Sequence, residues 1–259
     1  MNEILNETLS LIDNRRSVRA YQDRPIAPEV VDAIIQAAMR APTAGNMMLY
    51  SIVEIQEQAI KEKLAVSCDN QPFIAKAPLA LLFLADYQRW VDFFIASDVP
   101  AYCEAHGQDM RLPGEGDLLL ACCDALIAAQ TAVIAAEALG LGSCYIGDIM
   151  ENYEYHRALL DLPRYTFPVA LVCFGYPSTT AKSRTPRFPQ PYIHFKNAYR
   201  RLDEAALEDM FARRALPNYY GDATNLGQHI YARKFGADFS VEMTRSVRAA
   251  IQSWVEGED

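Results

Sequence analysis

Residues 14–46 read NRRSVRAYQDRPIAPEVVDAIIQAAMRAPTAGN, and they join a basic cluster to a turn of small residues through one amphipathic helix. The basic cluster consists of Arg15, Arg16, Ser17 and Arg19. Guanidinium groups offer paired donors to an anion such as a phosphate. The turn, residues 42–46, lets a flat ligand approach the backbone closely, because its side chains are small. The stretch therefore predicts two parts of a binding site at a distance fixed by a helix.

The helix in this stretch has a clear start and a clear buried face. Pro28 suits its first turn, and we expect it to run to about Arg40. Its apolar stripe is formed by Val30, Val31, Ile34, Ile35 and Ala38. The basic cluster has a structural alternative, a solvated corner in which the arginines pair with nearby carboxylates. The candidates are Asp13, Asp23 and Glu29, and the cluster taken alone favours this alternative.

Composition places the 259-residue chain among globular proteins, with 51% hydrophobic and 22% charged residues. The formal net charge of -9 disfavours nonspecific binding to nucleic acid or to an anionic membrane. The N-terminal residues do not resemble a signal peptide, and we expect no apolar run near the roughly 20 residues that a membrane span needs. The six cysteines form no C-x-x-C pair, so we interpret them as reduced thiols in a cytoplasmic protein.

Hydrophobic periodicity predicts a mixture of helices and strands without a steady βαβ rhythm, which favours an α+β fold. We expect strands at residues 50–55, 79–85 and 167–176, and a short extended piece that begins with residues 142–146. We expect helices at residues 3–12, 28–40, 57–66, 118–139 and 151–160. The C-terminal part predicts two or three amphipathic helices, at residues 203–214, 225–235 and 240–255. Residues 86–117 are expected to be irregular, with Pro100 and Pro113 as breakers. The aromatic side chains of this region either cover a ligand or belong to a packed peripheral helix. The two interpretations are equally supported.

The helix predicted at 118–139 is apolar nearly all round, so it must be buried on several sides. In a chain of this size, such a helix belongs at the centre of the fold or in a subunit interface. Asp124 and Gln130 are its main polar interruptions, and we expect them to make internal hydrogen bonds.

Two further stretches can carry a ligand. Lys182, Arg184 and Arg187 form a second basic cluster, for which the alternative is a solvated loop. Because a partly buried phosphate usually needs more than one cation, the two clusters strengthen each other. Residues 140–148 read GLGSCYIGD, which is not G-x-G-x-x-G and follows a helix, so we reject a dinucleotide-binding interpretation. Either a close approach of the backbone to a flat ring or a simple helix-to-strand turn remains.

Four segments in order resemble the nitroreductase family of FMN enzymes: RRSVR, APTAGN, GLGSCYIGD, and FPVALVCFGYP followed by PRFP. The match spans about residues 10–195. The resemblance implies that Arg15, Arg16, Ser17 and Arg19 hold the FMN phosphate and ribityl end. It implies that Ala44 and Asn46 line the flavin at a dimer interface and that Gln71 lies against the ring. It also implies that Tyr145, Ile146 and Gly147 pass along the isoalloxazine. The returning phosphate contact fits two alignments, one on Lys182 and Arg184, the other on Arg187.

The resemblance also implies a nitroreductase-like fold, with a mixed sheet flanked by helices, that acts as a homodimer. We expect a domain at residues 1–200 and a C-terminal helical extension at residues 201–259, packed on the same domain or on the dimer partner. The implied activity is hydride transfer from NADH or NADPH through FMN to a nitroaromatic, quinone or similar acceptor by a ping-pong mechanism. The alternatives are reductive dehalogenation, flavin turnover, or a flavin-binding sensor without turnover.

No other chemistry is predicted from the side chains. The four histidines, His106, His156, His194 and His229, are dispersed and show no metal-ligand spacing. No nucleophile motif such as G-x-S-x-G is present. We therefore expect no metal site and no protein nucleophile, which fits an enzyme whose flavin carries the redox chemistry.

Overall fold

A computed structural model describes residues 6–178, 185–212, 214 and 218–257. The chain forms two compact units, one of residues 1–180 with 242–259 and one of residues 181–241. The α-helices are α1 (Glu7–Asn14), α2 (Pro28–Met39), α3 (Gln58–Ser67), α4 (Gln88–Ala96), α5 (Val99–Ala105), α6 (Glu115–Ala138), α7 (Tyr153–Leu159), α8 (Glu204–Ala212), α9 (Leu226–Ile230) and α10 (Asp238–Glu256). The strands are β1 (Tyr50–Glu54), β2 (Leu79–Asp86), β3 (Gly142–Ile146) and β4 (Thr166–Gly175).

The four strands form one sheet in the order β1-β2-β4-β3. All three strand pairings are antiparallel, with Tyr50 opposite Ala85 and Cys144 opposite Cys173. This corrects the expectation of a mixed sheet, although the α+β class is confirmed. Within the described residues, the one parallel pairing is an isolated bridge between Ser17 and Ser143, outside the regular strands.

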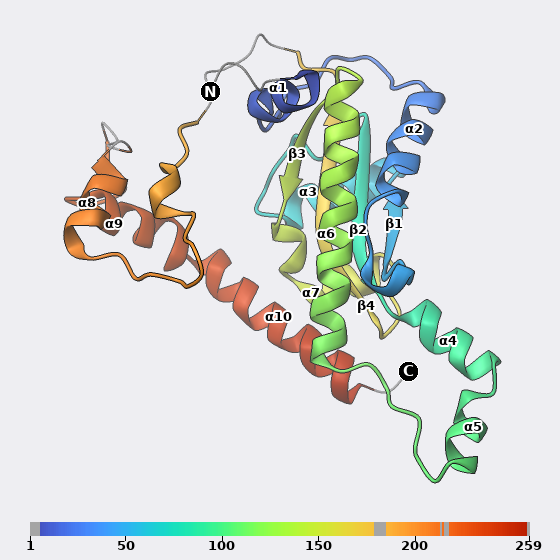
Figure 1. Cartoon of the computed structure of the whole chain (residues 1–259). Coiled ribbons are helices and arrows are strands. Elements are labelled where there is room, and N and C mark those ends of the chain that lie inside the picture. The colour runs from blue at the N-terminus through green and yellow to red at the C-terminus, as the bar shows by residue number, and fades with distance from the viewer. Residues whose placement is uncertain (1–5, 179–184, 213, 215–217, 258–259) are drawn as a thin grey trace. The chain divides into compact units, whose positions relative to one another are not determined.

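Both faces of the sheet are covered, and the period of two along β2 divides its residues between two cores. Leu79, Leu81, Phe83 and Ala85 pack with α2, α6 and the end of α10. Ala80, Leu82 and Leu84 pack with α3 and the turn after β3. Every residue of β2 and β4 is buried, as expected for uninterrupted apolar strands between two layers. Figure 1 shows α6 and α2 side by side over one face of the sheet.

Helix α6 lies along the centre of the first core, as its all-round apolar sequence predicts. A stripe of alanines from Ala121 to Ala136 is fully buried against the sheet, because small side chains let the helix approach the strands closely. By length and composition, α6 is also long and apolar enough to cross a membrane. The expectation that no apolar run approaches that length was therefore too strict. A buried core helix passes the same test, so the result is weak evidence for a membrane span.

The region expected to be irregular, residues 86–117, contains α4 and α5. Pro100 lies in the first turn of α5, where its missing N–H costs nothing, so it starts a helix instead of breaking one. In α4, Val91 is buried and Trp90 Nε1 donates to the carbonyl oxygen of Met47 at 2.9 Å. These contacts favour the packed-helix interpretation for α4, whereas Phe93 and Tyr102 are exposed.

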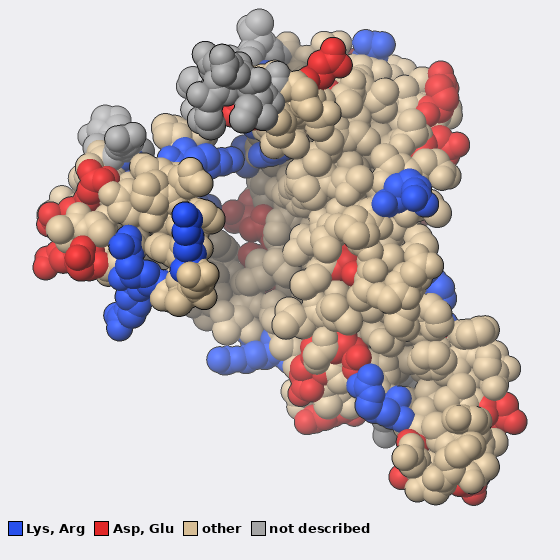
Figure 2. Space-filling view, viewed as in Figure 1, with Lys and Arg blue, Asp and Glu red and all other residues tan. Residues whose placement is uncertain are grey.

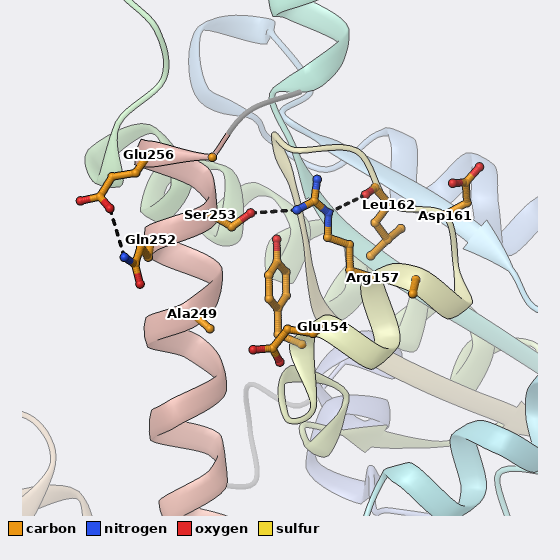
Figure 3. A pocket seen from close by; sticks show the side chains of 11 residues that line it. Glu154, Arg157, Asp161, Leu162, Ala249, Gln252, Ser253 and Glu256 are labelled. Carbon is orange, nitrogen blue, oxygen red and sulfur yellow. Dashed lines mark hydrogen bonds between the residues drawn. The ribbon is translucent and has the colours of Figure 1, made fainter.

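The second half of α10 packs against α7 in the first unit. Trp254 is buried to 1% exposure, and Ser246 Oγ donates to the carbonyl oxygen of Met150 at 2.7 Å. Arg157 of α7 donates from Nη1 to Ser253 Oγ at 2.9 Å, as Figure 3 shows. An open pocket of about 740 Å³ lies along this seam. The second half of α10 is thus an integral part of the first unit.

The second unit contains α8, α9, a short π-helix at Tyr231–Phe235 and a short 3-10 helix at Gln190–Tyr192. The rings of Phe188 and Phe211 pack edge-to-face with their centroids 5.1 Å apart. The guanidinium group of Arg214 lies over the Phe188 ring, 3.7 Å from its centroid. Met210 and His229 are buried. The predicted division of the chain at residue 200 stays a prediction.

Candidate active site

The arginine segment, residues 15–22, is attached to the edge of the sheet along β3. Val18 N donates to the carbonyl oxygen of Ser143 at 2.8 Å, and Ser17 forms the parallel bridge to the same residue. Gly142 makes this approach possible, because a Cβ there would meet the side chain of Val18 at 2.4 Å. The glycine predicted to allow a close approach of the backbone therefore accommodates the arginine segment itself.

The same segment is held again beyond its last arginine. Gln22 N donates to the carbonyl oxygen of Tyr176 at 2.8 Å, and Tyr21 Oη donates to the carbonyl oxygen of Val18 at 2.9 Å. Burial raises the pKa of Tyr21 far above its usual range, so its hydroxyl remains a donor. Residues 17–22 thus lie across the ends of β3 and β4, which fixes the backbone that carries the arginines.

The guanidinium groups of Arg15, Arg16 and Arg19 are available to an anionic ligand. No ion pair joins Arg15, Arg16 or Arg19 to a carboxylate in the described part of the chain. Burial raises the pKa of Cys144 on β3, while the charge of Arg19, a hydrogen bond from Ser17 and the charge of Arg15 lower it. Arg15, Ser17 and Arg19 therefore all act on the Cys144 thiol of β3. In the described part of the chain, no ion pair joins the arginines to Asp23 or Glu29.

Two further contacts define the surroundings of the arginines. The Arg19 guanidinium group lies over the ring of Phe73, 5.9 Å from its centroid. Burial raises the pKa of the Glu137 carboxyl, and the charges of Arg15 and Arg16 oppose that rise. An aromatic ring therefore lies beside Arg19, and the Glu137 carboxyl lies near Arg15 and Arg16.

The end of β3 leads to Gln71. Ile146 is buried, and a Cβ built on Gly147 would meet no atom within 4 Å, so the backbone there faces open space. Gln71 Nε2 donates to Asp148 Oδ2 at 2.8 Å. Tyr145 Oη donates to Gln130 Oε1 at 3.4 Å, and burial raises the pKa of Tyr145 to about 12. The structure thus brings Gln71 to the residues that follow Tyr145.

The turn of small residues is held by Asp124 of α6. Its carboxylate accepts from Ala44 N at 3.1 Å, from Leu49 N at 3.2 Å and from the hydroxyl of Thr43. Gly45 and Asn46 have φ near 55°, in the left-handed region that glycine and asparagine tolerate best. The prediction of an internal hydrogen bond at Asp124 is confirmed, and its role is to fix this turn.

The predicted site residues fall into separate groups. One group lies along the β3 edge and the turn that follows it, and it consists of Arg15, Arg16, Ser17, Arg19, Gln71, Tyr145, Ile146 and Gly147. Among the described residues, no hydrogen bond, ion pair or ring contact joins this group to the turn that carries Ala44 and Asn46. Lys182 and Arg184 lie outside the described residues. Arg187 belongs to the second unit, where it is exposed.

Sequence reasoning missed three neighbours of the site. Phe73 lies beneath Arg19, and Asp148 and Glu151 follow Gly147. Two acidic residues beside a buried strand are a weak signal, because acidic residues usually lie on the surface. Glu151 is nevertheless buried and Asp148 half-buried, which no local pattern reveals.

This arrangement belongs to a known family: the model of the nitroreductase family matches residues 12–176, so the chain is a member of it. Among curated proteins, it is 32% identical to the FMN reductase [NAD(P)H] of Bacillus subtilis over 85% of this chain and 86% of that protein. It is also 32% identical to the oxygen-insensitive NADPH nitroreductase of Salmonella typhimurium, over 78% of this chain and 79% of that one.

Among solved structures, the NADPH:FMN oxidoreductase from Vibrio harveyi, complexed with NAD+, is similar with a TM-score of 0.78 and 25% identity. The similarity covers 95% of this chain and 98% of the Vibrio harveyi chain. The nitroreductase-like fold is therefore confirmed.

Proposed function

We propose that the chain is an FMN-dependent oxidoreductase that takes a hydride from NADH or NADPH and passes electrons to a nitroaromatic, quinone or similar acceptor. The observation that carries this proposal is that the arginine segment is fixed on β3, and that its guanidinium groups form no ion pair with a carboxylate among the described residues. The relatives named as FMN reductase and NADPH nitroreductase support the same activity. Bound FMN supplies the hydride chemistry, and the protein holds and orients it.

The residues present fit a flat cofactor that ends in a phosphate. Arg15, Arg16 and Arg19 supply charge-assisted donors for the phosphate. Beside them, Ser143 Oγ is buried with no hydrogen-bond partner in the described part of the chain. The open space beside Gly147 leaves room for a ring along the backbone. We assign the phosphate end to the arginine segment and the ring to the stretch from Tyr145 to Gly147, with Gln71 at its edge.

A second copy of the chain completes this site in our proposal. Ala44 and Asn46, which make no described contact with the arginine segment, would reach the flavin of the partner subunit. Helix α6 exposes a row of large apolar side chains, Leu119, Leu120, Leu126 and Ile127. Figure 2 shows that the surface over this helix carries few charges. An uncharged apolar face of this kind favours a homodimer interface.

The remaining assignments complete the proposal. The basic stretch 182–187 would return to the phosphate, through Lys182 and Arg184 or through Arg187. Residues 201–259 would form the C-terminal extension on the same domain or on the partner. The free cysteines fit a cytoplasmic protein. Met47 and Met48, next to the turn, would form apolar walls for the acceptor.

Flavin release and arginine substitution test this function. The purified protein should release FMN on heating, and Arg16→Ala or Arg19→Ala should weaken FMN binding by roughly 1.5–3 kcal/mol, about 10- to 150-fold. Arg40→Ala is the matched control, because Arg40 is exposed at the end of α2, and it should bind FMN normally. Release of a flavin with an adenine, or unchanged affinity in both site variants, would contradict the proposal.

The alternatives are separated by turnover. A protein that binds FMN but oxidises neither NADH nor NADPH with any acceptor would be the flavin-binding sensor. Steady-state assays that compare nitroaromatics, quinones, halogenated aromatics and free flavin then assign the acceptor class.

A further inference from the structure

A pair of carboxyl groups lies directly behind Gln71. Gln71 Nε2 donates to Asp148 Oδ2 at 2.8 Å and to the carbonyl oxygen of Cys68 at 2.9 Å. Glu151 follows one turn after Asp148, and its backbone N–H donates to the carbonyl oxygen of Asp148 at 3.1 Å. Burial is the first cause that raises the pKa of Glu151, and the charge of Asp148 and a hydrogen bond with its side chain add to it. Such a bond requires a proton, because neither of two ionised carboxylates has a donor. We call Asp148 and Glu151 the carboxyl pair.

The proton of the carboxyl pair belongs on Glu151. This residue is only 4% exposed, and its Oε1 is buried with no hydrogen-bond partner among the described residues. An ionised oxygen in that position would be costly, because nothing compensates its lost hydration. Burial and the negative charges of Asp148, Asp69 and Glu242 raise the pKa of Glu151 to about 7. The pair therefore changes its charge near neutral pH.

The other groups around the pair do not offset a second negative charge. Burial raises the pKa of Cys68 to about 12 and lowers that of His156, so both are neutral at pH 7. Glu242 is itself held by Arg245 at 2.8 Å. In the described part of the chain, no cation forms an ion pair with either member of the carboxyl pair.

The carboxyl pair decides which end of the Gln71 amide is free. Both groups that meet its nitrogen are acceptors, so the amide oxygen is left to accept a further hydrogen bond. The pyrimidine edge of an oxidised flavin has one N–H donor between two carbonyl groups, which suits such an acceptor. A change in the charge of the pair acts on this edge through Asp148.

We propose that the carboxyl pair is a pH-dependent positioning device for the flavin, which holds the Gln71 amide in place while one proton is shared and weakens flavin binding once that proton is lost. This inference rests on the proposed function, in which Gln71 lies against the flavin. The second negative charge would lie next to Asp148, which accepts from the Gln71 amide, and would add to the repulsion of an anionic cofactor. By linkage, the flavin and the proton then stabilise each other's binding.

FMN affinity as a function of pH tests the proposal. Apoprotein is titrated with FMN at pH 6 and pH 9, and binding is followed by flavin fluorescence, for the wild type, Glu151→Gln and Asp161→Asn. Glutamine at 151 keeps a permanent donor to Asp148. Asp161 is an exposed acid with φ of 51°, a conformation that asparagine tolerates, so it is the matched control.

The expected result is a larger loss of affinity with pH in the wild type and in Asp161→Asn than in Glu151→Gln. The difference should be about tenfold, which corresponds to a shift of one unit in the Glu151 pKa on binding. Ionisation of the FMN phosphate near pH 6 affects all three proteins alike and cancels in this comparison. If Glu151→Gln does not fold, Asp148→Asn serves instead, because it also removes the second carboxylate.

Unfolding of the apoprotein by urea gives a readout without FMN. Between pH 4.5 and about 7 the native chain retains a proton that the unfolded chain has released, so stability should fall as pH rises through this window. Glu151→Gln should remove that fall. Equal pH dependence of FMN affinity in all three proteins would overturn this inference and leave the proposed function intact. Failure of the wild type to bind FMN at either pH would overturn both.

Discussion

The carboxylate of Asp124 is expected to hold the turn that carries Ala44 and Asn46, and Asp124→Ala tests this directly. Asp124 is only 3% exposed, and it accepts from two backbone N–H groups, those of Ala44 and Leu49. Alanine would leave the buried N–H of Leu49 and the part-buried N–H of Ala44 without this partner. A buried unpaired donor costs about 1–3 kcal/mol and a part-buried one costs less, so we expect a loss of roughly 1–4 kcal/mol in the free energy of unfolding. The hydroxyl of Thr43 can turn to another acceptor, so we count nothing for it.

Urea denaturation of the apoprotein measures this loss, and FMN titration measures its effect on the site. Thr131→Ala on the same helix is the control, because the Thr131 hydroxyl bonds only to the carbonyl oxygen of Ile127 one turn earlier. It should change stability by no more than about 0.5 kcal/mol. A loss below about 1 kcal/mol for Asp124→Ala would mean that the turn keeps its shape without the carboxylate, and our account of Asp124 would be wrong.

Three further outcomes are expected. Gly142→Ala should weaken FMN binding while the chain remains folded, because its Cβ would displace Val18 and with it the arginine segment; unchanged affinity in a titration would show that the segment is not tied to the site. Sedimentation at low micromolar concentration should give about twice the 29.0 kDa chain mass, and a monomer that still binds FMN would refute a site shared with Ala44 and Asn46. Steady-state kinetics should give parallel double-reciprocal lines, because donor and acceptor use one flavin face in turn; intersecting lines would require two separate sites.

Local patterns in the sequence predicted the elements that depend on composition. The uninterrupted apolar run of β2 predicts a buried strand, and this strand is found. The all-round apolar sequence of α6 predicts a helix buried on several sides, whereas in the single chain one face packs on the sheet and Leu119, Leu120, Leu126 and Ile127 are exposed. The arginine segment was identified as a candidate site because its residue types and the order of motifs are unusual. These features depend on residues close together in the chain.

Pro100 was interpreted as a breaker, although a proline in a first turn starts a helix. The remaining features depend on residues far apart in the chain. The mixed sheet was implied by the resemblance, and no local pattern fixes the direction in which β2, β3 and β4 pair. Glu151 is only 4% exposed, and burial of an acid cannot be recognised from its immediate neighbours.

The attachment of the arginine segment to β3 and β4 has a consequence for synthesis on the ribosome. Gln22 donates to the carbonyl oxygen of Pro177, 155 positions later in the chain. The arginines leave the exit tunnel early, yet the strands that hold them are among the last parts of the sheet to be made. Closing so long a loop is slow and costly in entropy. A nascent chain should therefore acquire affinity for FMN only after about residue 178 has emerged, and a ribosome stalled before that point should carry a chain that does not bind the cofactor.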